Sequence, residues 1–521
     1  MSDSIPLELL PGSSKIFQDF LIENTCDCSN VISKISERIY NRSLLTKLIN
    51  FSIGEENLSD LQKNNLILLQ ESNTFAVVTG QQAGFLGGSL YTLFKAVDTI
   101  RISNELSNKY PDFKFVPIFW IEDNDDDLKE SSVSCIYDSG NVPKYVNLNF
   151  DENLCVSGKK VVNEDLELIQ SLKDDFKKYQ FGQQISEIID EVFEIGKSWS
   201  ECFQNLYQKI LGQYGLLFIS ASELMKSGIF QNLVLSELIN TGYSQIAVDK
   251  RNKELEADGY HIQAQVSDIN LFYHIGDKRF RIDIENENFR INNELIDKNS
   301  LIKIANENPE NFCPKVLLRP IFQDAVLPTV VYVAGPGEIA YHKQTDYLYN
   351  LFNVIKPCLV MRTSATIIDK KAARYLSKIE LKPSYFLKSF SIIEKELADN
   401  LLGAEHNEVF SEFQEKFLNL YSDLEKYLLS IDNQLDKTVN GALVRINEQI
   451  NQLDKKAHSA AKRTNEELLQ KYQYLSNLIF PAGKLQERTI SPLVFLAQSD
   501  ELITQLLNNK AENKHHIFIE I

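Results

Sequence analysis

Two segments with the same pattern constrain the fold of this chain more than any other feature. Residues 77–95 read VVTGQQAGFLGGSLYTLFK, and residues 329–348 read TVVYVAGPGEIAYHKQTDYL. In each, an apolar β-branched run gives way to glycines and then to a helical pattern. A strand that ends in glycines and opens a helix brings free backbone N–H groups and the positive end of a helix dipole to one point, which favours an anionic ligand. The two turns therefore predict one shared cleft.

Apolar runs alternate with helix-length segments over much of the chain. The strand-like runs are 75–80, 114–123, 214–220, 316–322, 329–335 and 356–362, and helices are expected near 89–108, 222–241 and 338–352. Continuous apolar runs of this length are typical of strands that are buried on both faces. Their order predicts an α/β fold with a mostly parallel, doubly wound sheet. Short alternating runs within 134–160 and 257–300 predict antiparallel hairpins that are inserted as caps on the sheet.

The region from about 385 to 478 has a different, helical character. Apolar side chains recur there at intervals of three and four, at Phe413, Phe417, Leu420, Leu424, Tyr427 and Ile431 and again at Ile446, Ile450, Leu453 and Ala457. This periodicity predicts two coiled-coil segments. Asn440-Gly441 between them is either a turn between antiparallel helices or a stutter in one pattern, and we interpret it as a turn. The outer apolar stripe of such a hairpin has to dock on the body of the protein or on another subunit.

The length of 521 residues is too great for one compact core and predicts two or three domains. We assign residues 1–384 to a core that includes insertions near 134–200 and 257–312. Residues 385–478 form the helical domain, and 479–521 form a C-terminal segment that packs back on the core.

Charge and hydropathy exclude several classes of partner. The formal net charge of −18 and the lack of a basic stripe argue against a nucleic-acid partner, although one locally basic pocket is compatible with them. No apolar run approaches the roughly 18 residues of a membrane span, and the first residues lack a secretory signal. We therefore expect a cytoplasmic protein with no membrane partner. Seven scattered cysteines indicate no disulfide framework, and Cys26 and Cys28 lack the spacing of a CxxC pair.

The first glycine turn lacks the signatures of the common nucleotide-binding loops. It has neither the GK[ST] ending of a Walker loop nor the GxGxxG spacing of a dinucleotide site. It offers instead the side-chain amides of Gln81 and Gln82, and it is followed by Ser89, a candidate helix N-cap. Tyr91 and Lys95 lie one turn apart on the following helix and can face the same ligand. The alternative is that the glycines only make a tight turn and that Lys95 is solvated.

An acidic run, residues 122–127, follows the strand-like run that ends near Ile121. The carboxyl end of a parallel strand is where open α/β sheets bind ligands. Asp123, Asp125 and Asp127 have the opening spacing of a calcium loop, but Leu128 and Ser134 occupy the places of its glycine and glutamate, so an EF-hand is excluded. These carboxylates orient a substrate amine or bind Mg²⁺, or they form a solvated acidic loop.

No motif for a tightly bound metal is present. Glu338 and His342 have the spacing of part of an HExxH motif, but their order is reversed and a second histidine is missing. Glu338 is equally a capping residue for the helix that Gly335-Pro336-Gly337 opens. His342 is interpreted as an ordinary packing or surface histidine. The sequence therefore assigns no metal site.

Several long blocks of this sequence resemble the BshC family, the cysteine-adding enzymes of bacillithiol biosynthesis. The matching blocks are VVTGQQAGFLGGSLYTLFKA, VPIFWIEDNDDD, LGQYGLLFI, GYHIQAQV, VLLRPIFQDAVLPTVVYVAGPGEIAYHKQ, RTSATIID and LIFPAGKLQER. The resemblance implies a Rossmann-like, nucleotidyltransferase-type parallel sheet with connective-peptide insertions and an appended coiled coil that mediates a homodimer. It also implies a ligase that joins the carboxyl group of cysteine to the amino group of glucosaminyl-malate. Activation of that carboxyl group makes ATP, with Mg²⁺ as a possible companion, the expected co-substrate.

The resemblance also assigns residues to the cleft. It makes Asp125 and Asp127 the residues that position the amine. The substrate-binding residues it implies are Gly80, Gln81, Gln82, Gly84, Gly87, Gly88, Tyr91, Lys95, Gly335, Gly337 and Glu338. Three positions in two motifs depart from the family pattern. An acidic motif that usually resembles EDHD is Asn124-Asp125-Asp126-Asp127 here, and the usually aromatic position after GEIAY is His342.

Overall fold

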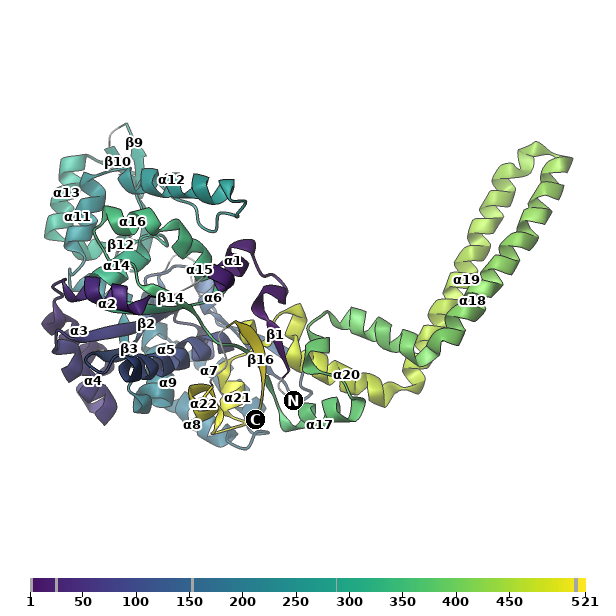
Figure 1. Ribbon diagram of the computed structural model, residues 1–521, viewed down its shortest axis with the longest axis horizontal. Helices are drawn as coiled ribbons and strands as arrows, with labels where there is room; N and C mark the ends of the chain where they lie inside the picture. The colour runs from purple at the N-terminus through teal and green to yellow at the C-terminus, as the bar shows by residue number, and fades with distance from the viewer. Residues whose placement is uncertain (1–2, 24–26, 151–153, 287, 510–513) are drawn as a thin grey trace. The chain divides into compact units, whose positions relative to one another are not determined.

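The chain forms two compact units, which are described separately. The computed structural model (Figure 1) describes residues 3–23, 27–150, 154–286, 288–509 and 514–521. The first unit, here called the α/β unit, comprises Met1–Asp369 and Gln486–Ile521, and the second, the helical unit, comprises Lys370–Leu485. Within the described part of the chain, no helix combines the length and the apolar character that a membrane span requires.

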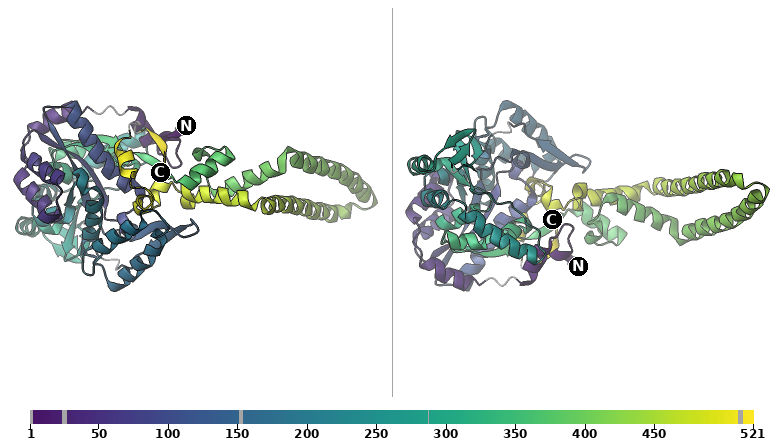
Figure 2. Two further views of the ribbon diagram at one scale, coloured as in Figure 1. Left: turned by 90° about the horizontal axis from the view of Figure 1, so that it is seen from below. Right: turned by 90° about the horizontal axis from the view of Figure 1, so that it is seen from above.

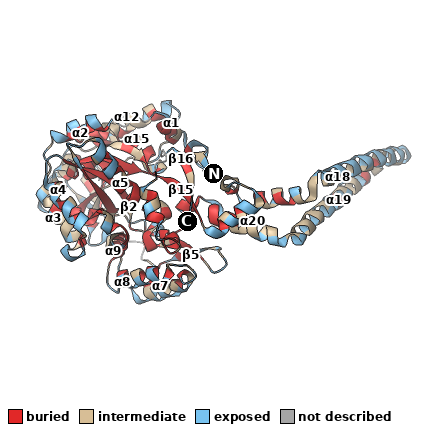
Figure 3. Ribbon diagram, turned by 60° about the horizontal axis from the view of Figure 1, so that its bottom comes forward, coloured by how far each residue is buried: buried red, intermediate tan, exposed pale blue. Residues whose placement is uncertain are grey.

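A parallel sheet of five strands forms the centre of the α/β unit. The strand order is β14-β13-β2-β3-β6, and the strands are β2 (Thr74–Gln82), β3 (Lys114–Glu122), β6 (Leu217–Ser220), β13 (Thr329–Ala334) and β14 (Cys358–Met361). Their apolar side chains are largely buried, as the red strands of Figure 3 show. This arrangement confirms the predicted Rossmann-like, mostly parallel sheet.

The order of the strands reverses between β2 and β13. After β2 the chain passes through α5 (Leu90–Lys109) to β3 on one side, whereas β13 lies on the other side of β2 and is followed by α15 (Pro336–Gln344). Because all five strands are parallel, their carboxyl ends lie at one edge of the sheet. A reversal of this kind leaves a crevice at that edge, which is the usual ligand site of an open α/β sheet.

One strand and two helices differ from the sequence prediction. The run 316–322 is a turn followed by the helix α14 (Arg319–Val326), because Pro320 stands in the first helical turn, where its fixed φ and missing N–H favour a helix start. The helix expected at 222–241 is divided into α10 (Ala221–Lys226) and α11 (Gln231–Ile239). The helix expected at 338–352 is likewise α15 and α16 (Asp346–Leu351).

The predicted antiparallel hairpins are present in both intervals. β4 (Val133–Tyr137) pairs with β5 (Pro143–Asn147). The second interval holds the sheet β11-β10-β9 and the hairpin of β7 and β8, and β12, from beyond that interval, pairs with β7. These strands are β7 (Leu271–Ile275), β8 (Lys278–Arg281), β9 (Asp283–Glu285), β10 (Asn288–Ile291), β11 (Glu294–Ile296) and β12 (Phe312–Pro314). A further sheet joins the two ends of the chain, with β1 (Ser4–Pro6), β16 (His515–Glu520) and β15 (Ser364–Ile368) in the order β1-β16-β15.

The helical unit contains α17 (Lys370–Ile379), α18 (Phe390–Ile431), α19 (Asp436–Thr464) and α20 (Glu466–Ile479). Helices α18 and α19 run side by side in both views of Figure 2, which confirms a long helical hairpin. The predicted turn at Asn440-Gly441 is wrong, because both residues lie inside α19. The chain reverses at 432–435, where the Asp432 carboxylate accepts a hydrogen bond from Gln434 N at 2.8 Å. Asn440 instead donates to Asp436 on the same helix.

Candidate active site

A cavity of about 900 Å³ lies at the carboxyl edge of the central sheet. The ends of β2, β3, β13 and β14 contribute to its wall, and the hairpin of β7 and β8 lies opposite them. Its charged lining residues are Lys95, Glu122, Asp125, Glu130, Arg279, Arg281, Lys315, Arg319, Glu338, Arg362 and Arg488. Seven of these are basic and four are acidic. In a chain whose net charge is −18, this is the locally basic pocket that the composition allows.

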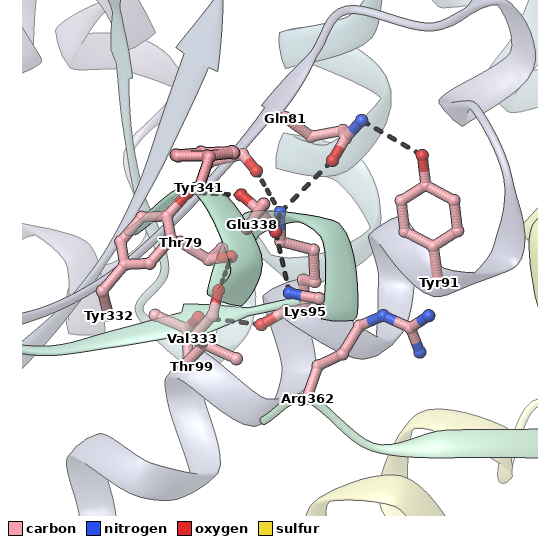
Figure 4. A network of polar contacts seen from close by, with 12 residues as sticks. Thr79, Gln81, Tyr91, Lys95, Thr99, Tyr332, Val333, Glu338, Tyr341 and Arg362 are labelled. Carbon is pink, nitrogen blue, oxygen red and sulfur yellow. Dashed lines mark hydrogen bonds and ion pairs between the residues drawn. The ribbon is translucent and has the colours of Figure 1, made fainter. Parts of the chain in front are cut away.

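Lys95 lies at the point where the two glycine turns meet (Figure 4). It is fully buried, and its Nζ donates to the Gly80 carbonyl, to Gln81 Oε1 at 3.2 Å and to Glu338 Oε2 at 2.7 Å. Gln81 in turn donates to the Tyr91 hydroxyl at 3.1 Å. The ion pair joins the helix after β2 to the helix after β13, so the structure brings the two turns together as predicted. Lys95 is buried rather than solvated.

Glu338 is both a helix cap and the counter-charge of Lys95. Its Oε2 accepts from Gly335 N at 2.8 Å, and its Oε1 accepts from the Tyr332 hydroxyl at 2.7 Å. Burial lowers the pKa of the Lys95 ammonium. Burial acts to raise the pKa of the Glu338 carboxyl, but the charge and hydrogen bond of Lys95, the charge of Arg319 and the Gly335 N–H together outweigh it, so the pKa is lowered. The pair therefore holds its two charges deep in the cleft.

A second charged group on the wall is built around Asp125. Its carboxylate accepts from the Gln82 side-chain amide and from Arg279, whose NH2 lies 2.9 Å from Asp125 Oδ1. Arg279 also bonds Asp126, and its guanidinium lies 4.0 Å from the ring centre of Phe272. Both oxygens of Asp125 are thus engaged, so the carboxylate is fixed in position.

Glu122 is the last residue of β3 and faces the same cavity. Its Oε2 accepts from Trp120 Nε1 at 3.0 Å. Burial raises the pKa of the Glu122 carboxyl to about 7, because Arg319 only partly offsets the loss of hydration. Burial likewise raises the pKa of Glu130, and the neighbouring Asp127 adds to that rise. Two carboxyl groups of the cleft therefore hold protons more readily than ordinary carboxyls.

Arg362 follows β14 and forms a buried ion pair away from the Lys95 pair. Its NH2 donates to Glu487 Oε1 at 2.7 Å, and only 2% of each side chain is exposed. Glu487 also accepts from Ala365 N and from the Ser364 hydroxyl, each at 2.9 Å. The Arg362 guanidinium lies 5.1 Å from the ring centre of Tyr91. This arrangement holds the Arg362 side chain on the cavity wall.

Four of the residues predicted for the site do not line the cavity. Strand β2 continues through Gln82, and the loop after it leaves the cavity, so Gly84, Gly87 and Gly88 are not among its lining residues; Gly87 is buried, and Gly84 and Gly88 are half-buried. The Gly87 carbonyl accepts from the Tyr207 hydroxyl at 2.8 Å, and Gly88 has a φ of 71°, which favours glycine. Asp127 is exposed and accepts from Glu130 N as the cap of α6 (Leu128–Ser131). Ser89 occupies the N-cap position of α5 but makes no side-chain cap bond.

The remaining predicted residues do line the cavity, and they are Gly80, Gln81, Gln82, Tyr91, Lys95, Asp125, Gly335, Gly337 and Glu338. Asp123, by contrast, is a structural carboxylate that accepts from Ser200, Ser220 and Ser222. His342 is fully buried between Tyr332 and Tyr341, with ring centres 5.1 and 5.0 Å away, so it is the packing residue that the sequence suggested. Cys26 lies outside the described residues.

The sequence analysis missed most of the basic side chains. Arg279, Arg319 and Arg362 come from a hairpin, a helix and the end of a strand, and no local spacing links them. One signal was available for Arg362, because it is the last residue of a predicted parallel strand and therefore lies at the same edge as Asp125. Arg319 donates to Tyr332 at 3.4 Å and to Tyr341, contacts that depend on the misassigned segment 316–322.

Comparison with known proteins gives a consistent result over the whole chain. Residues 12–363 match the family described as bacillithiol biosynthesis BshC, N-terminal Rossmann-like domain, and residues 365–520 match its C-terminal coiled-coil domain. Relatives in Chlorobaculum tepidum and Chloroherpeton thalassium are each 27% identical and are named "Putative cysteine ligase BshC". The alignments cover 93% and 95% of this chain and 92% and 91% of the relatives.

A relative in Flavobacterium psychrophilum with the same name is also 27% identical, over 92% of this chain and 90% of its own length. The two domains that the family descriptions name correspond in kind to the parallel sheet and to the helical hairpin found here. The chain therefore belongs to the BshC family.

Proposed function

We propose that this protein is a cysteine ligase that joins the carboxyl group of L-cysteine to the amino group of glucosaminyl-malate in bacillithiol biosynthesis. The observation that carries the proposal is the cleft itself, where seven basic side chains and a set of fixed carboxylates surround one cavity. Malate and cysteine both carry carboxylates, which arginine and lysine bind through charge-assisted hydrogen bonds. The names of the relatives support the same reaction.

The cations of the cleft also suit a phosphate-bearing co-substrate. Amide formation needs an activated carboxyl group, and ATP would supply that activation. Arg362, Arg488 and Arg319 are lining residues whose charges would hold phosphate groups, and Lys95 with the Gln81 amide lines the same cavity. Lys95 is already paired with Glu338. Its role is therefore to link α5 to α15 at the cleft as well as to attract anions.

The acidic side chains divide into two roles. The amine has to lose a proton when it attacks, and a base with a pKa near the working pH accepts that proton best. Glu122, whose pKa burial raises to about 7, fits this role. Asp125 is held by Gln82 and Arg279, so it fits the role of orienting the amine. Asp127, which caps α6 outside the cleft, takes no part.

Reconstitution tests the reaction directly. Purified protein is incubated with cysteine, glucosaminyl-malate, ATP and Mg²⁺, and the products are measured by mass spectrometry. We expect an amide whose mass is that of the two substrates less one water, together with AMP or ADP. If no amide forms under these conditions but nucleotide is cleaved when a different amine is supplied, the protein is another ligase on the same scaffold. If the substrates bind in the cleft but no reaction product forms, the protein is a binding protein rather than an enzyme.

Two matched variants test the division of roles in this reaction. Asp125→Asn should lower kcat/KM by about 100-fold, because the amide cannot hold the ammonium or amine as a carboxylate does. Asp127→Asn should retain the activity of the unmodified protein. Equal losses of kcat/KM in the two variants would mean that Asp127 has the catalytic role that the sequence suggested.

We propose further that the helical unit mediates a homodimer. Apolar side chains stand exposed along α18 and α19, among them Leu420, Tyr427, Ile431 and Val444 with exposed fractions of 58% or more. An exposed apolar stripe of this length is covered in a stable protein. Sedimentation should give a dimer, and the Leu420→Glu/Tyr427→Glu variant should be monomeric. A monomeric unmodified protein would refute the dimer without affecting the ligase proposal.

A further inference from the structure

A cluster of two histidines and an aspartate lies between α18 and α19 in the helical unit. His406 belongs to α18, and Asp454 and His458 lie one turn apart on α19. One ligand atom of each residue lies within 4.8 Å of the others. Among the described residues, this is the one group of at least three His, Cys, Asp or Glu side chains that meets this distance. No sequence motif indicates it, because its two halves are on different helices.

The two histidines both approach the carboxylate of Asp454. His406 Nε2 lies 2.7 Å from Asp454 Oδ1, and His458 Nδ1 lies 3.5 Å from the same oxygen. The ring of Phe410 packs 4.5 Å from that of His406 and holds its orientation. The side chains of His406 and His458 are 12% and 22% exposed, so the cluster is sheltered but open to a small ion.

The surroundings of His458 favour a cation at this centre. Its Nε2 lies 2.8 Å from Asp399 Oδ1, and its Nδ1 lies 2.9 Å from the Asp454 carbonyl oxygen. Both ring nitrogens thus face oxygen acceptors, although a neutral imidazole has only one N–H. If the proton is on Nε2, Asp399 accepts it, and the lone pair of Nδ1 faces the carbonyl and carboxylate oxygens of Asp454. Lone pairs that face one another in this way repel unless a cation lies beside them. A carboxylate that orients a histidine in this way is typical of metal sites.

We propose that His406, Asp454 and His458 bind one Zn²⁺ ion, with Asp399 orienting His458. Two imidazoles and one carboxylate supply three ligands of a tetrahedral site, and water completes it. Mg²⁺ and Ca²⁺ are disfavoured because they prefer an all-oxygen shell.

An ion at this position joins α18 to α19 close to a break in α18. Gly403 has a φ of 74° and non-helical geometry inside α18, between Asp399 and His406. A helix with such a break lacks the continuous backbone bonds that would make it rigid. Zinc bound by residues on both helices would hold the hairpin together at this level. The inference concerns the helical unit alone and does not depend on the ligase proposal.

Metal titration of the full-length protein tests the site. The protein is stripped with a chelator and titrated with Co²⁺, followed by visible absorption, and with Zn²⁺, followed by calorimetry. We expect one ion per chain and the absorption of four-coordinate Co²⁺. His406→Ala and His458→Ala should each weaken Zn²⁺ binding by about 100-fold or more, and Asp399→Asn by about 10-fold to 100-fold. The exposed His261 provides the control, and His261→Ala should bind as the unmodified protein does.

Several results would overturn the inference. One is that the unmodified protein shows no saturable Zn²⁺ binding. The other is that the His406→Ala/His458→Ala variant binds Zn²⁺ as well as the unmodified protein does, which would mean an adventitious ion only. In either case the two ring nitrogens of His458 serve only as hydrogen-bond partners of Asp399 and Asp454. Circular dichroism shows whether each variant keeps its helices. If an alanine variant does not fold, Asp399→Asn and the dependence of Tm on Zn²⁺ concentration in the unmodified protein decide the question. Ligase activity is not used as a readout.

Discussion

The two units treat charged side chains in opposite ways. In the α/β unit, Lys95 and Glu338 form an ion pair with 1% and 20% of their side chains exposed. In the helical unit, Lys416 and Glu412 form a pair of similar chemistry with 70% and 65% exposed. Burial of charge is costly in free energy, whereas exposed pairs contribute little to stability. Charges that are kept buried around a cavity therefore indicate a functional site, and those on the hairpin serve mainly to keep it hydrated.

The apolar side chains show the reverse contrast. The central sheet buries its apolar residues almost completely, as Val77, Ile118 and Val333 do. Helices α18 and α19 leave Leu420 and Tyr427 exposed in the single chain. The α/β unit is thus built to enclose its own core, whereas the hairpin has an apolar surface suited to another chain.

Removal of one partner of the buried pair should give the largest effect. Lys95→Met leaves the Glu338 carboxylate in the cleft without its counter-charge, and breaking a buried pair costs about 3–5 kcal/mol. Urea unfolding should show this loss, and kcat/KM should fall by at least about 1,000-fold because substrate anions lose a cation. Glu338→Gln and the double variant complete a cycle. The double variant should regain part of the stability but none of the activity, and strictly additive losses would contradict a coupled pair.

Replacement of Glu122 should have an intermediate effect that depends on pH. A base has to be deprotonated to act, so the rate should rise as the pH increases through about 7, the pKa of this carboxyl. Glu122→Gln should lower kcat by about 100-fold and remove that rise. A pH profile that keeps the same rise in the variant would assign the base to another group, with Glu130 the next candidate in the cleft.

Loss of a surface pair on the hairpin should have the smallest effect. Lys416→Ala removes a partner of Glu412 that is largely solvated already. The Tm should change by less than about 2 °C, since exposed i,i+4 pairs contribute little. Differential scanning calorimetry at low and high salt provides the measurement. A large shift that persists at high salt would mean that the pair is buried in the assembled protein, and that would place α18 in an interface at this point.

Sequence patterns predicted most of the strands and helices correctly, but they were less reliable at turns and at the ends of these elements. The five parallel strands, the inserted hairpins and the long helices followed from periodicity, which depends on residues close together in the chain. Errors arose where local preferences conflicted. The run 316–322 is apolar enough for a strand, but Pro320 begins a helix there. Asn440-Gly441 has the composition of a turn, yet the hairpin reverses at 432–435, with Tyr421 of α18 bonded to the Val439 carbonyl of α19.

The site shows the same division. Both glycine turns, Lys95, Glu338 and Asp125 could be selected because each lies next to a strand end in the sequence. The roles of Gly84, Gly87 and Gly88 could not be predicted, because a glycine that allows tight packing cannot be distinguished in a sequence from one that approaches a ligand. The basic wall formed by Arg279, Arg319 and Arg362 had no local signature at all.

The amino-acid sequence by itself determined most of the strands and helices, and it placed two glycine turns at the ends of parallel strands. Only the tertiary structure decided which charges share the cleft. The physical reason is that backbone preferences and hydrophobic periodicity act over a few residues, whereas an ion pair such as Lys95 with Glu338 joins side chains that are 243 positions apart. Such a pair exists only when β2 and β13 are neighbours in the sheet, and that pairing is set by the packing of the whole unit.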